Sequence, residues 1–381
     1  MLNNFCFQNP TKLIKGKGMI AQLSKEIPAD KKIMITFGGG SVKKNGVYDQ
    51  VKEALKNHNT IEFWGIEPNP AIETLREAIA LGKAEKVDFL LAVGGGSVID
   101  GTKLISAGLL YDGDAWDLVK KGKAENTIHL GTVLTLPATG SEMNDGAVIS
   151  CKETKEKYAF FSNFPKFSIL DPEVTFSLPD YQIACGIADT FVHVMEQYLT
   201  KSGESRVMDR WAESILQTLV EIAPKIKENK QDYQNMADFM MCATMALNGF
   251  IAMGVSQDWA THMIGHEVTA LTGLTHGHTL AIILPGTMDV LRKEKGEKIM
   301  QVGTRVFGVN SGTHDFRINE IIRKTREFFN SLGLTTSLSE NNIGKDVIDE
   351  IERRFNERDV HFGEDGLVTG SVAKEILEKV Y

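Results

Sequence analysis

The feature that most constrains the fold is a regular alternation of short apolar segments with helical patterns over the first 180 residues. Four segments have the composition of buried strands, namely 32–37, 61–66, 87–93 and 129–137. Helical patterns lie between successive members of this set. Strands that alternate with helices in this way predict βαβ units and a mostly parallel sheet with helices on both faces.

The second half of the chain has a different pattern. After about residue 186 the strand signals stop, and helical periodicity runs from Ile187 to about Lys227 and again from Tyr233. The stretch 236–254 is apolar nearly all round, which predicts a helix buried in the middle of a helical domain. A chain of 381 residues suits two domains. We expect an α/β domain over residues 1–180 and an all-helical domain over residues 181–381.

Composition and charge exclude several classes of protein. The net charge of −8 argues against nucleic acid or an anionic membrane as the main partner, because either would require a basic face. The four cysteines are scattered, which fits a reducing compartment and neither a disulfide framework nor a cysteine zinc site. No secretory signal is recognisable, and the longest apolar run, 239–247, is about half of the roughly 20 residues that a membrane span needs. We expect a soluble cytoplasmic protein.

Two glycine turns follow predicted strands directly. Their sequences are Gly38-Gly39-Gly40-Ser41 and Gly94-Gly95-Gly96-Ser97. Glycine lets the backbone approach a ligand closely, and the helix that follows presents free N–H groups to phosphate oxygens. Neither turn matches G-x-G-x-x-G or the P-loop spacing. Each alone is therefore equally compatible with a plain tight turn between a strand and a helix.

A third polar element, TLPATGSE, spans residues 135–142 after the fourth strand. Small hydroxyl groups at the carboxyl end of a strand suit hydrogen bonds to phosphate or to a nicotinamide carboxamide, although the same residues could simply cap the next segment. The three elements together predict a dinucleotide. No acidic residue lies in 38–46, whereas Lys43 and Lys44 do, so we expect NADP(H) in preference to NAD(H). The alternative is that both lysines lie on a solvated helix face.

Histidine spacing predicts a metal site. Asp189 and His193 are four residues apart in a helical pattern, as are His262 and His266, and each pair shares a helix face. His276 can join one member of the second pair if the chain reverses at Gly273. A carboxylate with imidazoles suits Fe(II), Zn(II) or a similar ion. The Asp189–His193 pair alone could be an ordinary hydrogen bond. The pattern differs from H-E-x-x-H, which makes a metalloprotease a poor interpretation.

Four motifs together resemble one known family. They are GGGSVID, TLPATGSE, GIADTFVHVMEQYL and HMIGHEVTALTGLTHGHTLAIILP. In this order, and over essentially the whole chain, the sequence is similar to the iron-containing (group III) alcohol dehydrogenases, most of all to their NADPH-dependent butanol dehydrogenase and aldehyde reductase branch. The resemblance implies a Rossmann-like dinucleotide-binding domain, an all-helical metal-binding domain, a dehydroquinate synthase-like architecture, one catalytic divalent ion and a homodimer.

The resemblance also implies roles for individual residues. Metal ligands fall on Asp189, His193, His262 and His276, while His266 lies near the substrate without binding the ion. Cofactor residues fall on Gly38, Gly39 and Ser41 at the adenosine end, on Gly94, Gly95, Gly96, Ser97 and Asp100 along the pyrophosphate, and on Thr135, Thr139 and Lys157 towards the nicotinamide. Gly39 stands where NAD-selective relatives carry aspartate. Lys157 follows a segment with Cys151 that we expect to form an exposed hairpin.

The expected reaction is hydride transfer between NADP(H) and a primary alcohol or aldehyde, with the ion polarising the substrate oxygen. His266 is the candidate proton relay, because an imidazole titrates near neutral pH. His278 is either a substrate-side residue or an internally satisfied histidine. The alternatives are a metal-dependent hydrolase, which would leave the glycine turns unused, and a dehydroquinate-synthase-type or glycerol-dehydrogenase-type relative of the same architecture.

Overall fold

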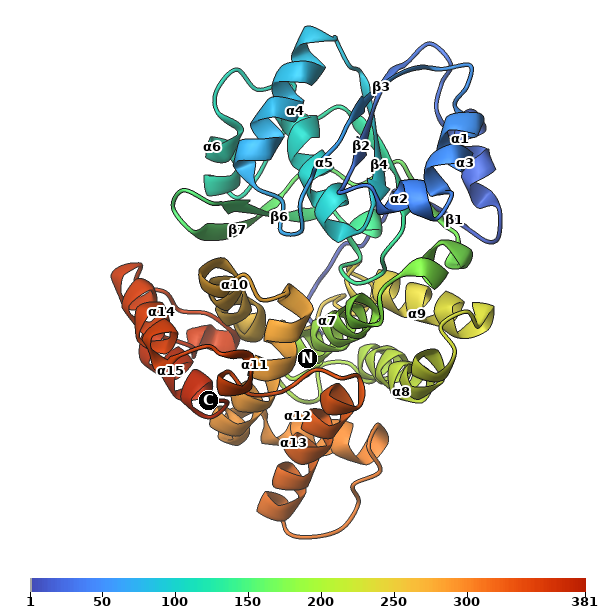
Figure 1. Ribbon diagram of the computed structural model, residues 1–381. Helices are drawn as coiled ribbons and strands as arrows, with labels where there is room; N and C mark the ends of the chain where they lie inside the picture. Colours follow the sequence, from blue (N-terminus) through green and yellow to red (C-terminus); the bar gives the residue numbers. More distant parts are fainter. Residues whose placement is uncertain (1) are drawn as a thin grey trace. The chain divides into compact units, whose positions relative to one another are not determined.

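The computed structural model describes residues 2–381 and divides into two compact units. The first, called here the α/β unit, comprises Gln8–Pro179 and Lys230–Thr244. The second, the helical unit, comprises Asp180–Asn229 and Met245–Tyr381 together with the N-terminal residues as far as Phe7. Figure 1 labels most of the helices and strands of both units.

A six-stranded sheet forms the centre of the α/β unit, and every neighbouring pair in it is parallel. The strand order is β1-β8-β5-β4-β2-β3. The strands are β1 (Lys12–Lys15), β2 (Lys32–Phe37), β3 (Asn59–Phe63), β4 (Phe89–Gly94), β5 (His129–Leu134) and β8 (Phe167–Leu170). Every residue of β4 is buried, as expected for a central strand of a sheet that is covered on both faces.

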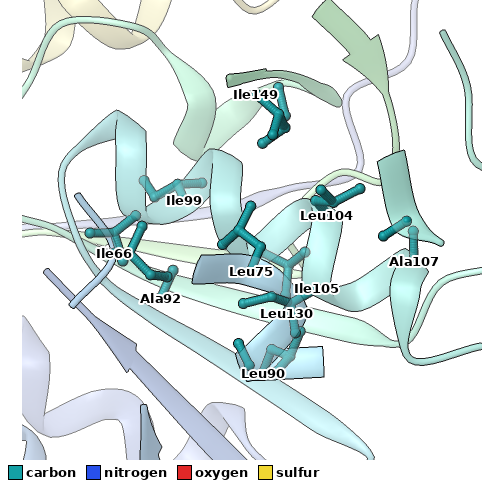
Figure 2. Close-up of a cluster of buried hydrophobic side chains, with 14 of the residues drawn as sticks. Ile66, Leu75, Leu90, Ala92, Ile99, Leu104, Ile105, Ala107, Leu130 and Ile149 are labelled. Atoms are coloured by element: carbon teal, nitrogen blue, oxygen red, sulfur yellow. The ribbon is translucent and has the colours of Figure 1, made fainter. Parts of the chain in front are cut away.

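Helices cover both faces of this sheet (Figure 1). On one face, α4 (Ile72–Ala84), α5 (Gly96–Gly108) and α6 (Ala115–Lys120) enclose an apolar cluster. Figure 2 shows part of it, with Leu75 of α4 and Ile99 of α5 above Leu90 and Ala92 of β4. On the other face, the core is closed by α1 (Leu23–Glu26), α3 (Val47–Ala54) and the short helices around them.

The predicted parallel sheet with helices on both faces is confirmed, and the four predicted strands correspond to β2, β3, β4 and β5. Two further strands were missed, since β1 and β8 have only four residues each. A separate antiparallel hairpin joins β6 (Gly146–Cys151) to β7 (Glu156–Phe161). The prediction that Cys151 is exposed there was wrong, because alternate residues of β6 face the core and Cys151 is among them.

The remaining long helices are α7 (Asp180–Tyr198), α8 (Arg206–Glu228), α9 (Tyr233–Ala246), α10 (Ala260–Thr272), α11 (His276–Val290), α12 (Arg292–Arg305), α13 (His314–Ser331), α14 (Lys345–Glu357) and α15 (Gly370–Glu378). Among residues 2–381, none of the helices combines the length and apolar character that crossing a bilayer requires. The stretch 236–254 was predicted to lie in the middle of the helical domain, which is correct only for residues 245–254. Its helix, α9, belongs to the α/β unit as far as Thr244, and Met240 packs in that unit's core.

Candidate functional site

Helix α7 carries two of the predicted metal ligands. Asp189 and His193 are separated by one helical turn and share a face, as their spacing predicts. The whole segment from Ile183 to Tyr198 is buried, so both side chains lie inside the helical unit. A carboxylate and an imidazole held this deeply require partners, because burying an unpaired charge is costly.

Helices α10 and α11 bring the other histidines to the same place. Gly273 ends α10 with a φ of 75°, a left-handed conformation that glycine adopts without strain, and α11 begins three residues later at His276. The chain therefore reverses where the sequence predicts. Both α7 and α10 pack against α11, which places the first residue of α11 beside Asp189.

The ligand atoms converge on one carboxylate oxygen. Asp189 Oδ1 lies 3.6 Å from His193 Nε2, 3.7 Å from His262 Nε2 and 3.9 Å from His276 Nε2. One ligand atom from each of Asp189, His262 and His276 lies within 4.8 Å of the others. His193 is outside that group of three, but its ring stacks on the His262 ring with centroids 4.6 Å apart.

These residues fit a divalent cation. Within residues 2–381, the buried Asp189 Oδ1 and His262 Nε2 have no hydrogen-bond partner. Leaving such an atom unpaired costs about 1–3 kcal/mol, and a shared cation would satisfy both atoms. Burial alone lowers the pKa of His262, but the carboxylates of Glu196 and Asp189 outweigh burial and raise that pKa to about 9. The surrounding carboxylates therefore favour positive charge at this position.

Glu196 is a member of this site that the sequence analysis missed. Its carboxylate accepts hydrogen bonds from His262 Nδ1 and from the backbone N–H of Thr261. Because Nδ1 is engaged, the Nε2 of His262 is the nitrogen directed at Asp189. The available signal was its spacing, since Asp189, His193 and Glu196 stand at positions i, i+4 and i+7 of one helix.

We expect Glu196→Gln to weaken the binding of Fe(II) or Zn(II) about 10- to 100-fold, because the amide orients His262 less strongly and makes it a weaker ligand. The measurement is a metal titration of the metal-free protein. Glu213→Gln is the matched control, since Glu213 is a buried carboxylate of the same unit that binds Tyr198 and Arg305 instead. Equal metal affinity in Glu196→Gln and wild type would contradict the assigned role.

The two remaining histidines of the cluster lie in different surroundings. The His266 ring is buried, with its centroid 5.1 Å from that of His276. His278 lies in α11, where its Nε2 donates to the Thr335 carbonyl at 3.1 Å. Its Nδ1 must therefore accept from the Tyr181 hydroxyl, also at 3.1 Å. Both ring nitrogens of His278 are thus engaged within the unit, and burial lowers its pKa.

In the α/β unit, the polar turns predicted from sequence lie along one edge of the sheet. Strand register places Phe37 of β2 beside Val93 of β4, and Gly94 of β4 beside Leu134 of β5. The two glycine turns and the 135–142 loop therefore start at neighbouring strand ends. Thr135 N–H also donates to the Gly94 carbonyl at 3.0 Å. The carboxyl edge of a parallel sheet is where open α/β folds bind ligands.

The two turns use glycine for different reasons. A Cβ on Gly96 would lie 2.4 Å from Thr139 Oγ1, and one on Gly94 would lie 2.5 Å from the Val98 side chain. The second turn thus needs glycine so that α5 and the 135–142 loop can pack closely. A Cβ on Gly39 would meet nothing within 4 Å, so the first turn is open at that position.

The other predicted cofactor residues are held by internal hydrogen bonds. Lys157 Nζ donates to Asn69 Oδ1 at 2.9 Å, and Asn69 N–H donates to Ser97 Oγ at 3.2 Å. Asn69 therefore links two predicted cofactor residues, which the sequence analysis did not anticipate. The buried Asp100 accepts from Ser141 Oγ at 2.6 Å and from Val148 N–H at 2.9 Å. These bonds give Asp100 a role in positioning the 135–142 loop.

Comparison with protein families gives two matches that together cover almost the whole chain. Residues 10–172 match the model described as iron-containing alcohol dehydrogenase. Residues 183–380 match the C-terminal model of the Fe-containing alcohol dehydrogenase family.

Individual proteins that are similar to this chain belong to the same group of dehydrogenases and reductases by name. The chain is 48% identical over 384 residues to the NADPH-dependent aldehyde reductase YqhD of Escherichia coli (strain K12), with 99% of each chain covered. It is 44% identical over 358 residues, 92% of each chain, to a probable NADH-dependent butanol dehydrogenase 1 of Bacillus subtilis (strain 168). The crystal structure of E. coli K-12 YqhD superposes with a TM-score of 0.98, covering 100% of this chain and 99% of that one at 48% identity. NADH-dependent butanol dehydrogenase A from Thermotoga maritima gives 0.94 at 35% identity, with coverage of 100% and 99%.

Proposed function

Because the chain belongs to the iron-containing alcohol dehydrogenase family, we propose that it interconverts primary alcohols and aldehydes by hydride transfer with NADP(H). The observation that carries the proposal is the convergence of Asp189, His262 and His276 within 4.8 Å. A metal-dependent hydrolase would need such a site as well, but it would leave the nucleotide-type edge of the α/β unit without a purpose. We assign nucleotide binding to the α/β unit and metal binding to the helical unit.

In this proposal Asp189, His193, His262 and His276 would hold Fe(II) or Zn(II). A bound ion supplies a Lewis acid that polarises the substrate oxygen. Glu196 fixes the orientation of His262 through its hydrogen bond to Nδ1. His266, which lies beside His276, transfers the proton of the substrate hydroxyl towards solvent. A bound nicotinamide would supply the hydride chemistry, and residues of the α/β unit would orient it.

The cofactor residues proposed are Gly38, Gly39, Ser41, Gly94, Gly95, Gly96, Ser97, Asp100, Thr135, Thr139 and Lys157. The preference for NADP(H) rests on the open turn at Gly39, which has no acidic side chain in residues 38–46 to repel a 2′-phosphate. Lys43 adds a cation there, with its Nζ 4.0 Å from the centre of the Trp64 ring. Relatives of known name use either cofactor, since the E. coli protein is called NADPH-dependent and the B. subtilis protein NADH-dependent.

Gly39→Asp is expected to shift the ratio of kcat/KM for NADPH to that for NADH towards NADH by on the order of 10- to 100-fold, through repulsion between the carboxylate and the 2′-phosphate. The control is Gly39→Ala, which adds a Cβ in open space and no charge. Steady-state kinetics with both cofactors measure the ratio. If Gly39→Ala and Gly39→Asp shift it equally, charge is not what selects the cofactor.

The decisive test of the proposed function is an aldehyde panel with NADPH and NADH on protein reconstituted with Fe(II) or Zn(II). We expect turnover that a chelator abolishes and the same ion restores. A saturable change in NADPH fluorescence on binding is expected as well. If the metal-loaded protein binds NADPH but reduces no aldehyde, the proposed reaction is wrong. If the protein does not bind NADPH, the metal-dependent hydrolase becomes the better interpretation.

We further propose a homodimer in the cytoplasm. The four free cysteines, of which Cys151, Cys185 and Cys242 are buried, support a reducing compartment. Light scattering on the purified protein tests the dimer, since a monomeric mass at micromolar concentration would contradict it.

A further inference from the structure

Trp259 has a backbone conformation that is unusual for its side chain. Its φ of 67° places it in the left-handed region, immediately before the first residue of α10. Between residues 2 and 381, the other non-glycine residues with positive φ are asparagines, aspartates and lysines. Asparagine and aspartate tolerate this region, whereas a residue with a bulky ring is strained there. Strain of this kind persists where the surrounding structure fixes the residue, often at a functional site.

The indole of Trp259 lies against two of the proposed metal ligands. Its ring centroid is 5.3 Å from that of His262 and 6.2 Å from that of His193, edge to face in both cases. Those two imidazoles stack on one another, so one indole contacts both. Trp259 Nε1 donates to Gln257 Oε1 at 2.9 Å, which fixes the orientation of the indole.

Burial shows what the indole does for these ligands. His193 is 4% exposed and His262 is 5% exposed, whereas Trp259 is only partly buried. Part of the indole therefore covers the imidazoles and part remains accessible. The other groups at the cluster are carboxylates and imidazoles, which attract the polar end of a substrate. The accessible part of Trp259 is an apolar surface next to them.

We propose that Trp259 is a specificity-determining residue whose indole contacts the alkyl chain of the substrate beside the metal ligands. This inference rests on the proposed function. The strained backbone of Trp259 is then explained, because it holds a large apolar ring against His193 and His262, where the ring can meet a hydrocarbon chain. Favourable contact between indole and alkyl chain raises kcat/KM as the chain lengthens, by roughly fourfold for each methylene group buried.

The position of the indole is tested without turnover. Co(II), which quenches nearby tryptophan fluorescence, is titrated into the metal-free wild type, Trp259→Phe and Trp211→Phe. Trp211 is the matched control, because it stacks on Phe250 at 4.3 Å in the same unit. We expect wild type and Trp211→Phe to be quenched alike and Trp259→Phe to lose most of the quenching. Undiminished quenching in Trp259→Phe would overturn the placement.

The specificity is tested with straight-chain aldehydes of two to eight carbons on wild type, Trp259→Phe and Trp259→Gly. Glycine adopts the required φ freely, so this variant removes the indole while keeping the start of α10, and circular dichroism verifies its fold. We expect kcat/KM to rise roughly fourfold for each added methylene group in wild type. The rise per methylene group should be smaller in Trp259→Phe and less than about twofold in Trp259→Gly.

The outcomes separate the inference from the function on which it rests. If wild type reduces no aldehyde, the proposed function fails, and the substrate contact of Trp259 fails with it. If wild type is active and Trp259→Gly lowers kcat/KM equally for every chain length, the function stands and the alkyl contact is wrong. An unchanged chain-length dependence in Trp259→Gly overturns the inference in the same way.

Discussion

Replacing Asp189 by asparagine is expected to lower the affinity of the protein for Fe(II) or Zn(II) by roughly two to four orders of magnitude, and turnover with it. The side chain is 5% exposed, and its Oδ1 is the atom on which the three histidines converge. Asparagine keeps the shape of the side chain but removes the negative charge. Removing one partner of a buried charge interaction typically costs about 3–5 kcal/mol.

Metal content after reconstitution and a metal titration by calorimetry measure this effect. Asp315→Asn is the matched control, because the Asp315 side chain is 85% exposed on α13 and far from any proposed ligand in sequence. If Asp189→Asn retained a full equivalent of metal with unchanged affinity, the ligand set would have to be reassigned.

A second large effect is expected on stability from Lys103→Met in α5. Lys103 is fully buried, and its Nζ donates to Ser141 Oγ, to Asn144 Oδ1 and to the Gly146 carbonyl. Burial lowers the pKa of Lys103 to about 8, while the nearby Asp100 carboxylate opposes that shift, so the ammonium is charged at neutral pH. Methionine removes the charge near Asp100 and should reduce the free energy of unfolding by about 3–5 kcal/mol.

Thermal unfolding followed by circular dichroism checks this expectation, with the exposed Lys25→Met as control. NADPH affinity should fall in Lys103→Met as well, because the same three bonds hold the 135–142 loop and the start of β6. A melting temperature equal to that of wild type would show that the buried pair is not a net contributor to stability.

The sequence predicted the structure best where a periodic pattern of apolar residues or of helical spacing contained an unusual residue, such as glycine or histidine. Apolar runs followed by glycine located β2 and β4, and the i, i+4 spacing located Asp189 with His193. The reversal that delivers His276 was predictable because Gly273 can adopt a positive φ. In each case the local pattern carries most of the information.

The sequence could not show which elements and side chains of the chain contact one another in three dimensions. An apolar helix surface indicates burial but not the neighbour, so α9 was placed in the wrong half of the protein. Glu196 and Asn69 were missed for the same reason, since their roles depend on which nitrogen or hydroxyl lies within reach in three dimensions. The short strands β1 and β8 are defined by pairing with each other and with β5, which four residues cannot reveal.

The chain passes between its two units four times, because residues 230–244 return to the α/β unit before the helical unit is completed. A fragment cut after residue 180 would lack Met240, which fills part of the α/β core, and Thr244, whose hydroxyl bonds the buried Glu142 in the loop that follows β5. Neither half of the gene therefore encodes a self-sufficient module. Recombination between relatives would have to exchange two separate stretches together to transfer an intact α/β unit, and three to transfer the helical unit.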